Sequence, residues 1–371
     1  MSLLYKDDWD DAKERFKAWW AHDNFGRCGL SVTAPRKDPP RVEEPARPPT
    51  PEKRWTDLDY IGALGEYRNA RTFFGGEAFP VWSYGYPGNK RLAVFLGCPL
   101  TLDFETGWLD PILVDEDIDC HSLRIDEGEP HWQFTLSWLR RGAQEATGKS
   151  VPAVGAFGGC GDTLAALRGS DRLLYDVADR PVQVREADQF LMDLWCKVYD
   201  TFSDIVKEAA EGSTCWFGLW SPGKFYAAQN DFSYMISPQM FRDVFLPTIE
   251  KQTRFLDHCV YHVDGIGAFA HVDALLELPR LQAVQILPGA GKPSPLHYMD
   301  VLTKVQAAGK NLHISIPPEQ VEPALSELSA RGLFIATTCS TEDEARSLLK
   351  RAEKWSRERT AAAVTNGGRG R

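Results

Sequence analysis

The sequence lacks the features that place a chain in a membrane or on nucleic acid. No run reaches the roughly 18 apolar residues that a spanning helix needs. Lys and Arg total 42 against 52 Asp and Glu, and the basic residues form no stripe interleaved with aromatics. The segment from Met1 to Trp20 has no continuous apolar stretch after a basic head, so we expect no secretory signal. We expect a cytoplasmic chain without nucleic acid or membrane partners.

Patterned cysteines and a dinucleotide-binding turn are also missing. The eight cysteines are scattered and no C-x-x-C occurs, so we expect no disulfide framework and a reducing compartment. No glycine-rich phosphate-binding turn follows the first predicted strand, which disfavours an open doubly wound sheet.

The chain does contain a regular alternation of apolar strands and helices, clearest after residue 150. Such alternation is typical of a parallel sheet covered by helices. Helices are predicted over residues 8–20, 60–74, 130–148, 181–212, 238–258 and 341–357. Strands are predicted to start at Arg27, Ala78, Val151, Thr214, Cys259, Gln282, Asn311 and Leu333. Eight such strands predict an α/β fold of the (β/α)8 TIM barrel type with an elaborated N-terminal region.

The length of 371 residues suits one domain of this kind, because a barrel with insertions uses that much chain. Residues 1–150 are expected to carry the first strands, an N-terminal extension and insertions. Residues 151–357 are expected to form the regular part of the barrel. The small, polar, Gly- and Arg-rich tail at 358–371 is predicted to be disordered.

Active sites of such barrels lie where the strands end, so the loops after the strands matter most. The third strand is followed by GGCGDTL at residues 158–164. This stretch suits a helix cap, or an anion held by backbone N–H groups. Asp231 follows the fourth strand, and it is either a turn residue or a catalytic or substrate-binding carboxylate.

The fifth strand ends in the sequence YHVDG, which carries a histidine and a carboxylate two residues apart. Alternation along a strand places His262 and Asp264 on the same side. An imidazole beside a carboxylate can act as acid and base, or bind a metal. Cys339 follows the eighth strand and is expected to face the same mouth. His262, Asp264 and Cys339 together are candidate zinc ligands, although Cys339 also suits a small buried residue.

Aromatic residues are abundant, with 12 tryptophans, and several gather near predicted strand ends. They either pack the core or line a pocket for an apolar or ring-shaped ligand. The predicted substrate-binding residues are Trp220, Tyr226, Tyr84 and Gln285.

Four stretches in this order resemble the uroporphyrinogen decarboxylase superfamily, which includes methylcobamide:thiol methyltransferases. They are GGCGDTLAALRG from residue 158, QNDFSYMISPQMFRDVFLP from 229, YHVDG from 261 and TTCSTEDEA from 337. The resemblance covers residues 151–349 well and residues 1–150 loosely. It implies a (β/α)8 barrel with its site at the mouth.

In the zinc-dependent methyltransferases of this superfamily, a His-x-Cys pair and a later Cys hold the metal. His262 matches the first ligand and Cys339 the last, whereas Asp264 stands where the first Cys would be. The decarboxylase itself meets its polycarboxylate substrate with an Arg-rich N-terminal segment, and residues 33–36, TAPR, lack that pattern. The resemblance therefore favours a diverged member over a haem-pathway enzyme.

Three functions follow as hypotheses. The first is a methyltransferase-type enzyme that moves a methyl group to a thiol at a zinc site, with the methyl group supplied by a corrinoid on a partner protein. The second is a metal-free lyase, decarboxylase or hydrolase that acts on a small ring-shaped substrate through His262, Asp264 and Asp231. The third is a non-catalytic binding protein on an enzyme fold. A homodimer is a further expectation.

Overall fold

The computed structural model describes residues 2–23, 25–83, 91–114 and 118–357. The predicted tail at 358–371 and the predicted site residue Tyr84 lie outside these ranges. The main sheet is formed by β1 (Gly29–Pro35), β2 (Thr72–Gly76), β9 (Phe225–Gln229), β10 (His258–Asp264), β11 (Ala283–Leu287), β12 (Asn311–Ser315) and β13 (Leu333–Thr338).

The strand order in this sheet is β2-β1-β13-β12-β11-β10-β9. Every neighbouring pair is parallel except β1 and β2, which are antiparallel. Parallel strands joined through helices bury both faces of a sheet, which explains why β9 and β10 are almost wholly apolar or buried. The predicted parallel α/β architecture is confirmed.

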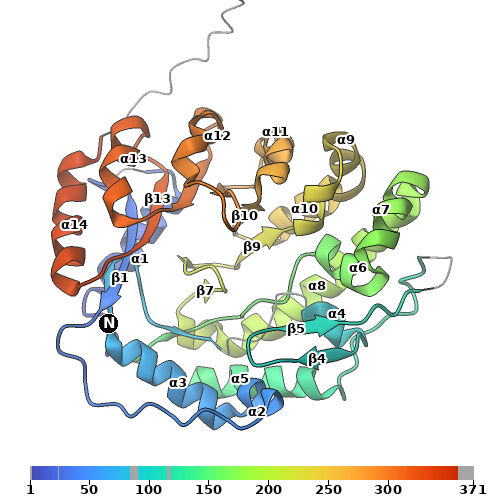
Figure 1. Cartoon of the computed structure of the whole chain (residues 1–371), viewed down its shortest axis with the longest axis horizontal. Helices are drawn as coiled ribbons and strands as arrows, with labels where there is room; N and C mark the ends of the chain where they lie inside the picture. Colours follow the sequence, from blue (N-terminus) through green and yellow to red (C-terminus); the bar gives the residue numbers. More distant parts are fainter. Residues whose placement is uncertain (1, 24, 84–90, 115–117, 358–371) are drawn as a thin grey trace, which may run out of the picture.

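Shorter strands lie beside the main sheet. They are β3 (Val81–Trp82), β4 (Leu100–Leu102), β5 (Gly107–Leu109), β6 (Val151–Pro152), β7 (Ser213–Thr214) and β8 (Trp220–Ser221). β3 pairs with β6 in parallel, whereas β4–β5 and β7–β8 are antiparallel pairs. Figure 1 shows the helices as an outer layer around the strands. Among the described residues the strand ladders do not join into a continuous closed barrel.

The first helices are α1 (Trp9–Trp20), α2 (Pro51–Thr56), α3 (Leu58–Arg71), α4 (Arg91–Phe95), α5 (Pro130–Glu145), α6 (Cys160–Arg168) and α7 (Ser170–Asp179). The later ones are α8 (Pro181–Ala210), α9 (Pro238–Met240), α10 (Leu246–Phe255), α11 (Val272–Leu276), α12 (Met299–Ala307), α13 (Val321–Glu327) and α14 (Glu342–Trp355). Short 3-10 or π turns are η1 (Asp231–Met235), η2 (Phe241–Phe245), η3 (Ile266–His271), η4 (Pro295–Tyr298) and η5 (Pro318–Gln320). No helix in the described ranges is long and apolar enough to cross a bilayer.

Local sequence signals explain several of these boundaries. α8 begins with Pro181 at its first turn and ends at Ala210, and the next residue, Glu211, has left-handed backbone angles before Gly212. α14 begins after Thr341, whose hydroxyl accepts a hydrogen bond from the Glu344 backbone N–H. The predicted helices over 130–148, 181–212 and 341–357 match α5, α8 and α14 within a few residues.

Two predicted segments differ from the structure. The helix predicted over 60–74 ends at Arg71, and residues 72–76 form β2, which pairs with the edge of β1. The fourth strand predicted from Thr214 is interrupted, because residues 213–221 form the β7–β8 pair. The strand that extends the main sheet is instead β9, in a segment interpreted from the sequence as a loop.

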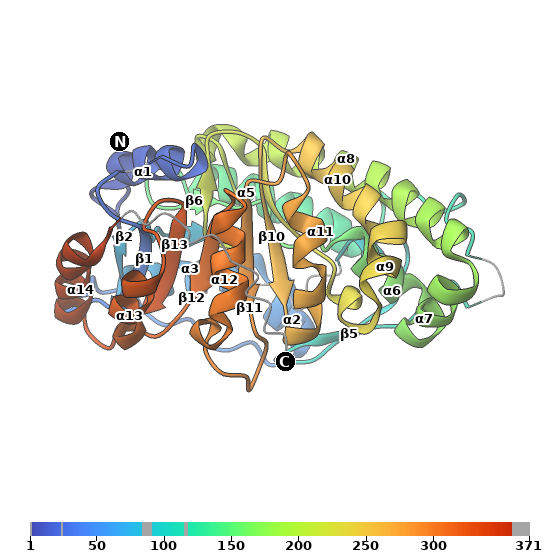
Figure 2. The same ribbon diagram turned by 90° about the horizontal axis from the view of Figure 1, so that it is seen from above.

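The N-terminal helix α1 covers one end of the strands (Figure 2). Its Phe16 ring stacks on Phe334 of β13, and Trp20 packs 5.3 Å from Phe225 of β9. The indole N–H groups of Trp19 and Trp20 donate to the backbone oxygens of Gly332 and Trp220. The aromatic face of α1 therefore seals the end of the sheet where these strands begin, and the opposite end is left for a site.

Candidate functional site

A pocket lies at the carboxyl ends of the parallel strands and holds about 680 Å³. Its wall of hydroxyl groups comes from Ser31 and Thr33 of β1, Ser315 of β12 and Thr338 of β13. The Thr33 and Thr338 hydroxyls are 2.9 Å apart and hydrogen-bond to each other. The strand register explains this grouping, because Thr33 is paired with Thr338 across β1 and β13.

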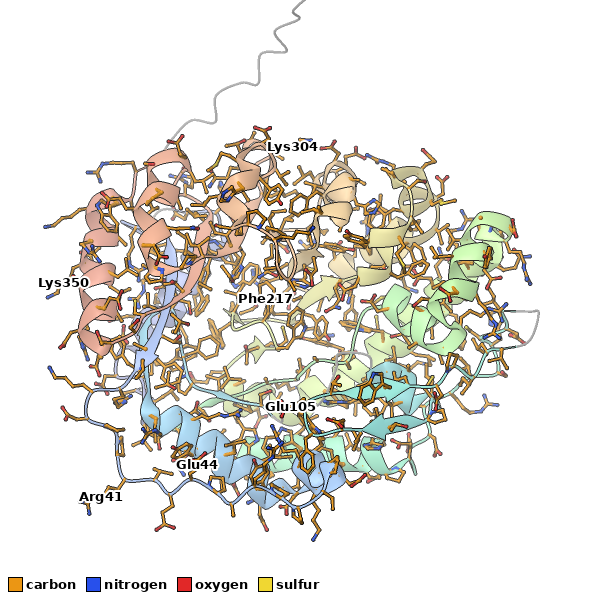
Figure 3. All side chains as sticks on the ribbon, in the orientation of Figure 1. Arg41, Glu44, Glu105, Phe217, Lys304 and Lys350 are labelled. Atoms are coloured by element: carbon orange, nitrogen blue, oxygen red, sulfur yellow. The ribbon has the colours of Figure 1, made fainter. Side chains whose placement is uncertain are left out.

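The other walls of the pocket carry imidazole, amide and aromatic groups. His262, Gln285 and His313 come from the adjacent strands β10, β11 and β12. Trp216 and Phe217, from the loop between β7 and β8, complete the lining on this side. Phe217 lies near the middle of the molecule in Figure 3, inside the outer layer of helices. Trp216 meets the His262 ring edge-on, with ring centroids 5.2 Å apart.

His262 is a pocket residue that lies beside a carboxylate. Its Nε2 lies 3.7 Å from an Asp264 carboxylate oxygen, and its Nδ1 is hydrogen-bonded to Gln285 Oε1. Burial lowers the pKa of His262, but Asp264, Gln285 and the charge of Asp231 together raise it above its usual value. An imidazole in this setting can take up a proton and pass it on.

Asp231 begins η1, beside this pair, and is exposed. Its carboxylate accepts a hydrogen bond from Gln229 Nε2 at 3.2 Å. The same amide donates to Asp162 at 3.1 Å, and the Asp162 carboxylate also accepts from the Phe232 backbone N–H. The charge of Asp231 acts on His262, although neither Asp231 nor Asp264 lines the pocket, so a shared catalytic role stays a prediction.

The glycines of the 158–164 segment allow close packing. A side chain at Gly159 would meet the Gln229 carbonyl oxygen at 2.0 Å. Together with the hydrogen bonds of Asp162, this close approach docks the start of α6 against the end of β9. The cap of α6 is Gly159, which makes no side-chain hydrogen bond to the first turn, and the predicted anion site stays a prediction.

Cys339 lies apart from the predicted zinc ligands. It is buried, its backbone N–H donates to the Thr33 oxygen, and it does not line the pocket. Burial, with the Glu344 charge, raises the pKa of its thiol to about 11. Within the described ranges no three His, Cys, Asp or Glu side chains are grouped to hold a metal. The predicted set of His262, Asp264 and Cys339 therefore does not fit a zinc ion.

Two of the predicted substrate-binding residues are core residues. Trp220 is buried beside Trp9 of α1, and its indole N–H donates to the Ala210 oxygen. Tyr226 is fully buried against Phe157 and Trp195 on the helical side of β9. The sequence predicts a mouth position for Trp220 at the end of a strand from Thr214 and for Tyr226 in the loop that follows, whereas residues 213–221 form the β7–β8 pair and residues 225–229 form β9. Once that segment is a strand, alternation directs Tyr226 away from the side that carries Gln229.

His313 and Phe217 are not among the residues predicted from the sequence, whereas Trp216 belongs to the aromatic residues expected to hold a ring-shaped ligand. His313 is buried at the floor of the pocket, 3.1 Å from Gln285 Nε2. A signal for it existed, because a histidine occupies the centre of the apolar strand NLHIS, where an unpaired polar group is costly. Gln285, which was predicted, lies between the two histidines.

Comparison with solved structures finds proteins of similar fold. The fold is similar to that of a methyltransferase from Methanosarcina mazei, with a TM-score of 0.61, 12% sequence identity, and coverage of 92% of this chain and 98% of that chain. A methylaspartate ammonia lyase from Clostridium tetanomorphum aligns over 60% of this chain and 47% of its own at 13% identity, with a TM-score of only 0.31. No family model and no curated protein matches the chain. At 12% identity, the first match establishes a shared fold.

Proposed function

We propose that this chain is a methyltransferase-type enzyme whose His262 accepts the proton of a thiol while a methyl group passes to the sulfur. The observation that carries the proposal is His262, which lines a pocket of about 680 Å³ at the strand ends and lies 3.7 Å from the Asp264 carboxylate. The fold shared with a methyltransferase adds support.

The proposal also includes a fold more specific than a parallel α/β sheet, namely a (β/α)8 barrel of the uroporphyrinogen decarboxylase superfamily. The parallel pair β3–β6 supports it, as does the hydrogen bond from the Val154 N–H to the Thr214 oxygen. These contacts link β3 through the region of β6 to β7, outside the main sheet.

The proposed reaction requires a base and a methyl donor. The thiol S–H bond breaks, its proton moves to His262 Nε2, and the sulfur forms a bond to the methyl carbon. The bond between the methyl carbon and the donor breaks, and its electron pair leaves with the donor. Asp264 stabilises the imidazolium, and Gln285 accepts the hydrogen bond from Nδ1. A methylated corrinoid carried by a partner protein is the proposed donor.

The direct test combines free methylcobalamin with a small neutral thiol such as 2-mercaptoethanol under anaerobic conditions. Thioether formation is followed by mass spectrometry. We expect methyl transfer by the wild type and a loss on the order of 100-fold or more in His262→Gln, because proton transfer contributes that much. Cys339→Ala is the matched variant and should keep activity, whereas a zinc site that used Cys339 would lose it. Equal rates in wild type and His262→Gln would contradict the proposal.

A metal-free lyase, decarboxylase or hydrolase is the second candidate. It would use the same acid–base groups as the first. Two observations favour it: Trp216 and Phe217 place aromatic rings beside His262, and the predicted zinc ligands are not grouped within the described ranges. Release of carbon dioxide from aromatic ring carboxylic acids, without methyl transfer from methylcobalamin, would favour this candidate over the first.

A further inference from the structure

Three buried side chains form a hydrogen-bonded row at the floor of the pocket. His262 Nδ1 is bonded to Gln285 Oε1, and Gln285 Nε2 lies 3.1 Å from His313 Nδ1. The row follows from strand register, because His262 is paired with Gln285 and Gln285 with His313. Paired residues on neighbouring strands point to the same face, so the sheet itself holds the three groups in line.

His313 is enclosed by aromatic rings. Phe334 stacks against it with an interplanar angle of 13°, and Phe217 lies 4.8 Å away on centroid distance. Burial, and then the nearby charge of His262, lower the pKa of His313 to about 3. His313 is therefore neutral at physiological pH, and one of its ring nitrogens is an acceptor.

The primary amide of Gln285 has one accepting end and one donating end. If its NH2 group donates to His313 Nδ1, its oxygen must face His262 and can only accept. His262 then carries a proton on Nδ1 in its neutral form, which leaves the lone pair on Nε2, the nitrogen 3.7 Å from the Asp264 carboxylate. With the amide reversed, Nδ1 of neutral His262 would accept, Nε2 would carry the proton, and His262 could not take a proton from a substrate.

We propose that His313 is a positioning residue which, through Gln285, selects the nitrogen of His262 that exchanges protons in the pocket. The catalytic consequence rests on the proposed function, but the tautomer of His262 is a property of the resting protein. The charged groups that face His262 are Asp264 and Asp231, and His313 is the titratable group beyond Gln285.

The test measures the tautomer directly by two-bond ¹H–¹⁵N correlation NMR on protein labelled with ¹⁵N-histidine, at a pH where His262 is neutral. We expect a single Nδ1–H tautomer at His262 in the wild type. His313→Phe keeps an aromatic ring but removes the acceptor, so a mixture of tautomers should appear. In the His313→Phe background, Gln285→Glu supplies a group that only accepts, and it should restore the Nδ1–H form.

A matched control and a second variant complete the test. His258→Phe removes another imidazole of β10, one that bonds to Ser221 and not to Gln285, and it should leave the His262 tautomer unchanged. If thermal unfolding shows that His313→Phe does not fold, Gln285→Leu should produce the same mixture.

Two results would overturn the assignment. One is a wild-type neutral His262 that carries its proton on Nε2. The other is a His262 that keeps a single Nδ1–H tautomer in both His313→Phe and Gln285→Leu. Because the readout needs no turnover, a failure of methyl transfer would leave it intact. If methyl transfer is found, His313→Phe should also lower kcat on the order of 10-fold to 100-fold.

Discussion

At the residue scale, the neighbours of His262 raise the pKa of its imidazole. Burial alone would lower its pKa, since a charged imidazole is poorly solvated there. Asp264 and Asp231 supply negative charge, and the hydrogen bond between Nδ1 and Gln285 Oε1 also favours the charged imidazole. A base whose strength depends on carboxylates should lose strength when one carboxylate becomes neutral.

Asp264→Asn should therefore lower the pKa of His262. The sign follows because the variant removes a charge that favours the imidazolium, while burial continues to disfavour it. The ¹H chemical shift of the His262 ring, followed against pH, measures the change. Asp300→Asn makes the same change in net charge on the exposed face of α12, and it should leave the titration curve where it was. A curve for Asp264→Asn that coincides with the wild type would contradict this account.

At the scale of elements, Gly29 of β1 leaves room for the ring of Phe334, its pairing partner on β13. A Cβ at Gly29 would lie 2.4 Å from the Phe334 ring, which stacks on His313 and on Phe16 of α1. The glycine thus lets one phenylalanine connect the floor of the pocket with the N-terminal helix.

Gly29→Ala should destabilise the protein by about 1–3 kcal/mol, the usual result of forcing atoms into a packed core. Urea unfolding measures the loss. Gly65→Ala in α3 is the control, because a side chain there meets nothing within 4 Å and alanine favours a helix by about 1 kcal/mol over glycine. Equal stabilities for Gly29→Ala and the wild type would show that the Phe334 ring moves freely.

At the scale of the whole molecule, Glu77 ties the N-terminal segments to the sheet. Its buried carboxylate accepts from both guanidinium NH2 groups of Arg27 at 2.7 Å, from Arg15 of α1, and from the Leu30 backbone N–H. The charges of Arg27 and Arg15 outweigh burial and hold the pKa of Glu77 below its usual value. One carboxylate therefore joins α1, the start of β1 and the residue after β2.

Glu77→Gln should destabilise the folded protein by about 3–5 kcal/mol, because it leaves buried guanidinium charge without its counter-charge. The melting temperature and urea midpoint report the loss. Glu105→Gln breaks an exposed pair with Arg47 and should change stability by less than about 1 kcal/mol. Similar losses in both variants would argue against a special role for Glu77.

The sequence alone determined the alternation of strands and helices, most helix boundaries after residue 130, and the shared side of His262 and Asp264. Those features depend on local periodicity and capping, which single segments carry. Only the tertiary structure decided that residues 225–229 form a strand, that Tyr226 and Trp220 are core, that Cys339 lies outside the pocket, and that His313 completes the row. Each of these depends on which distant strand a residue pairs with, and pairing is set by packing between segments that are far apart in the chain.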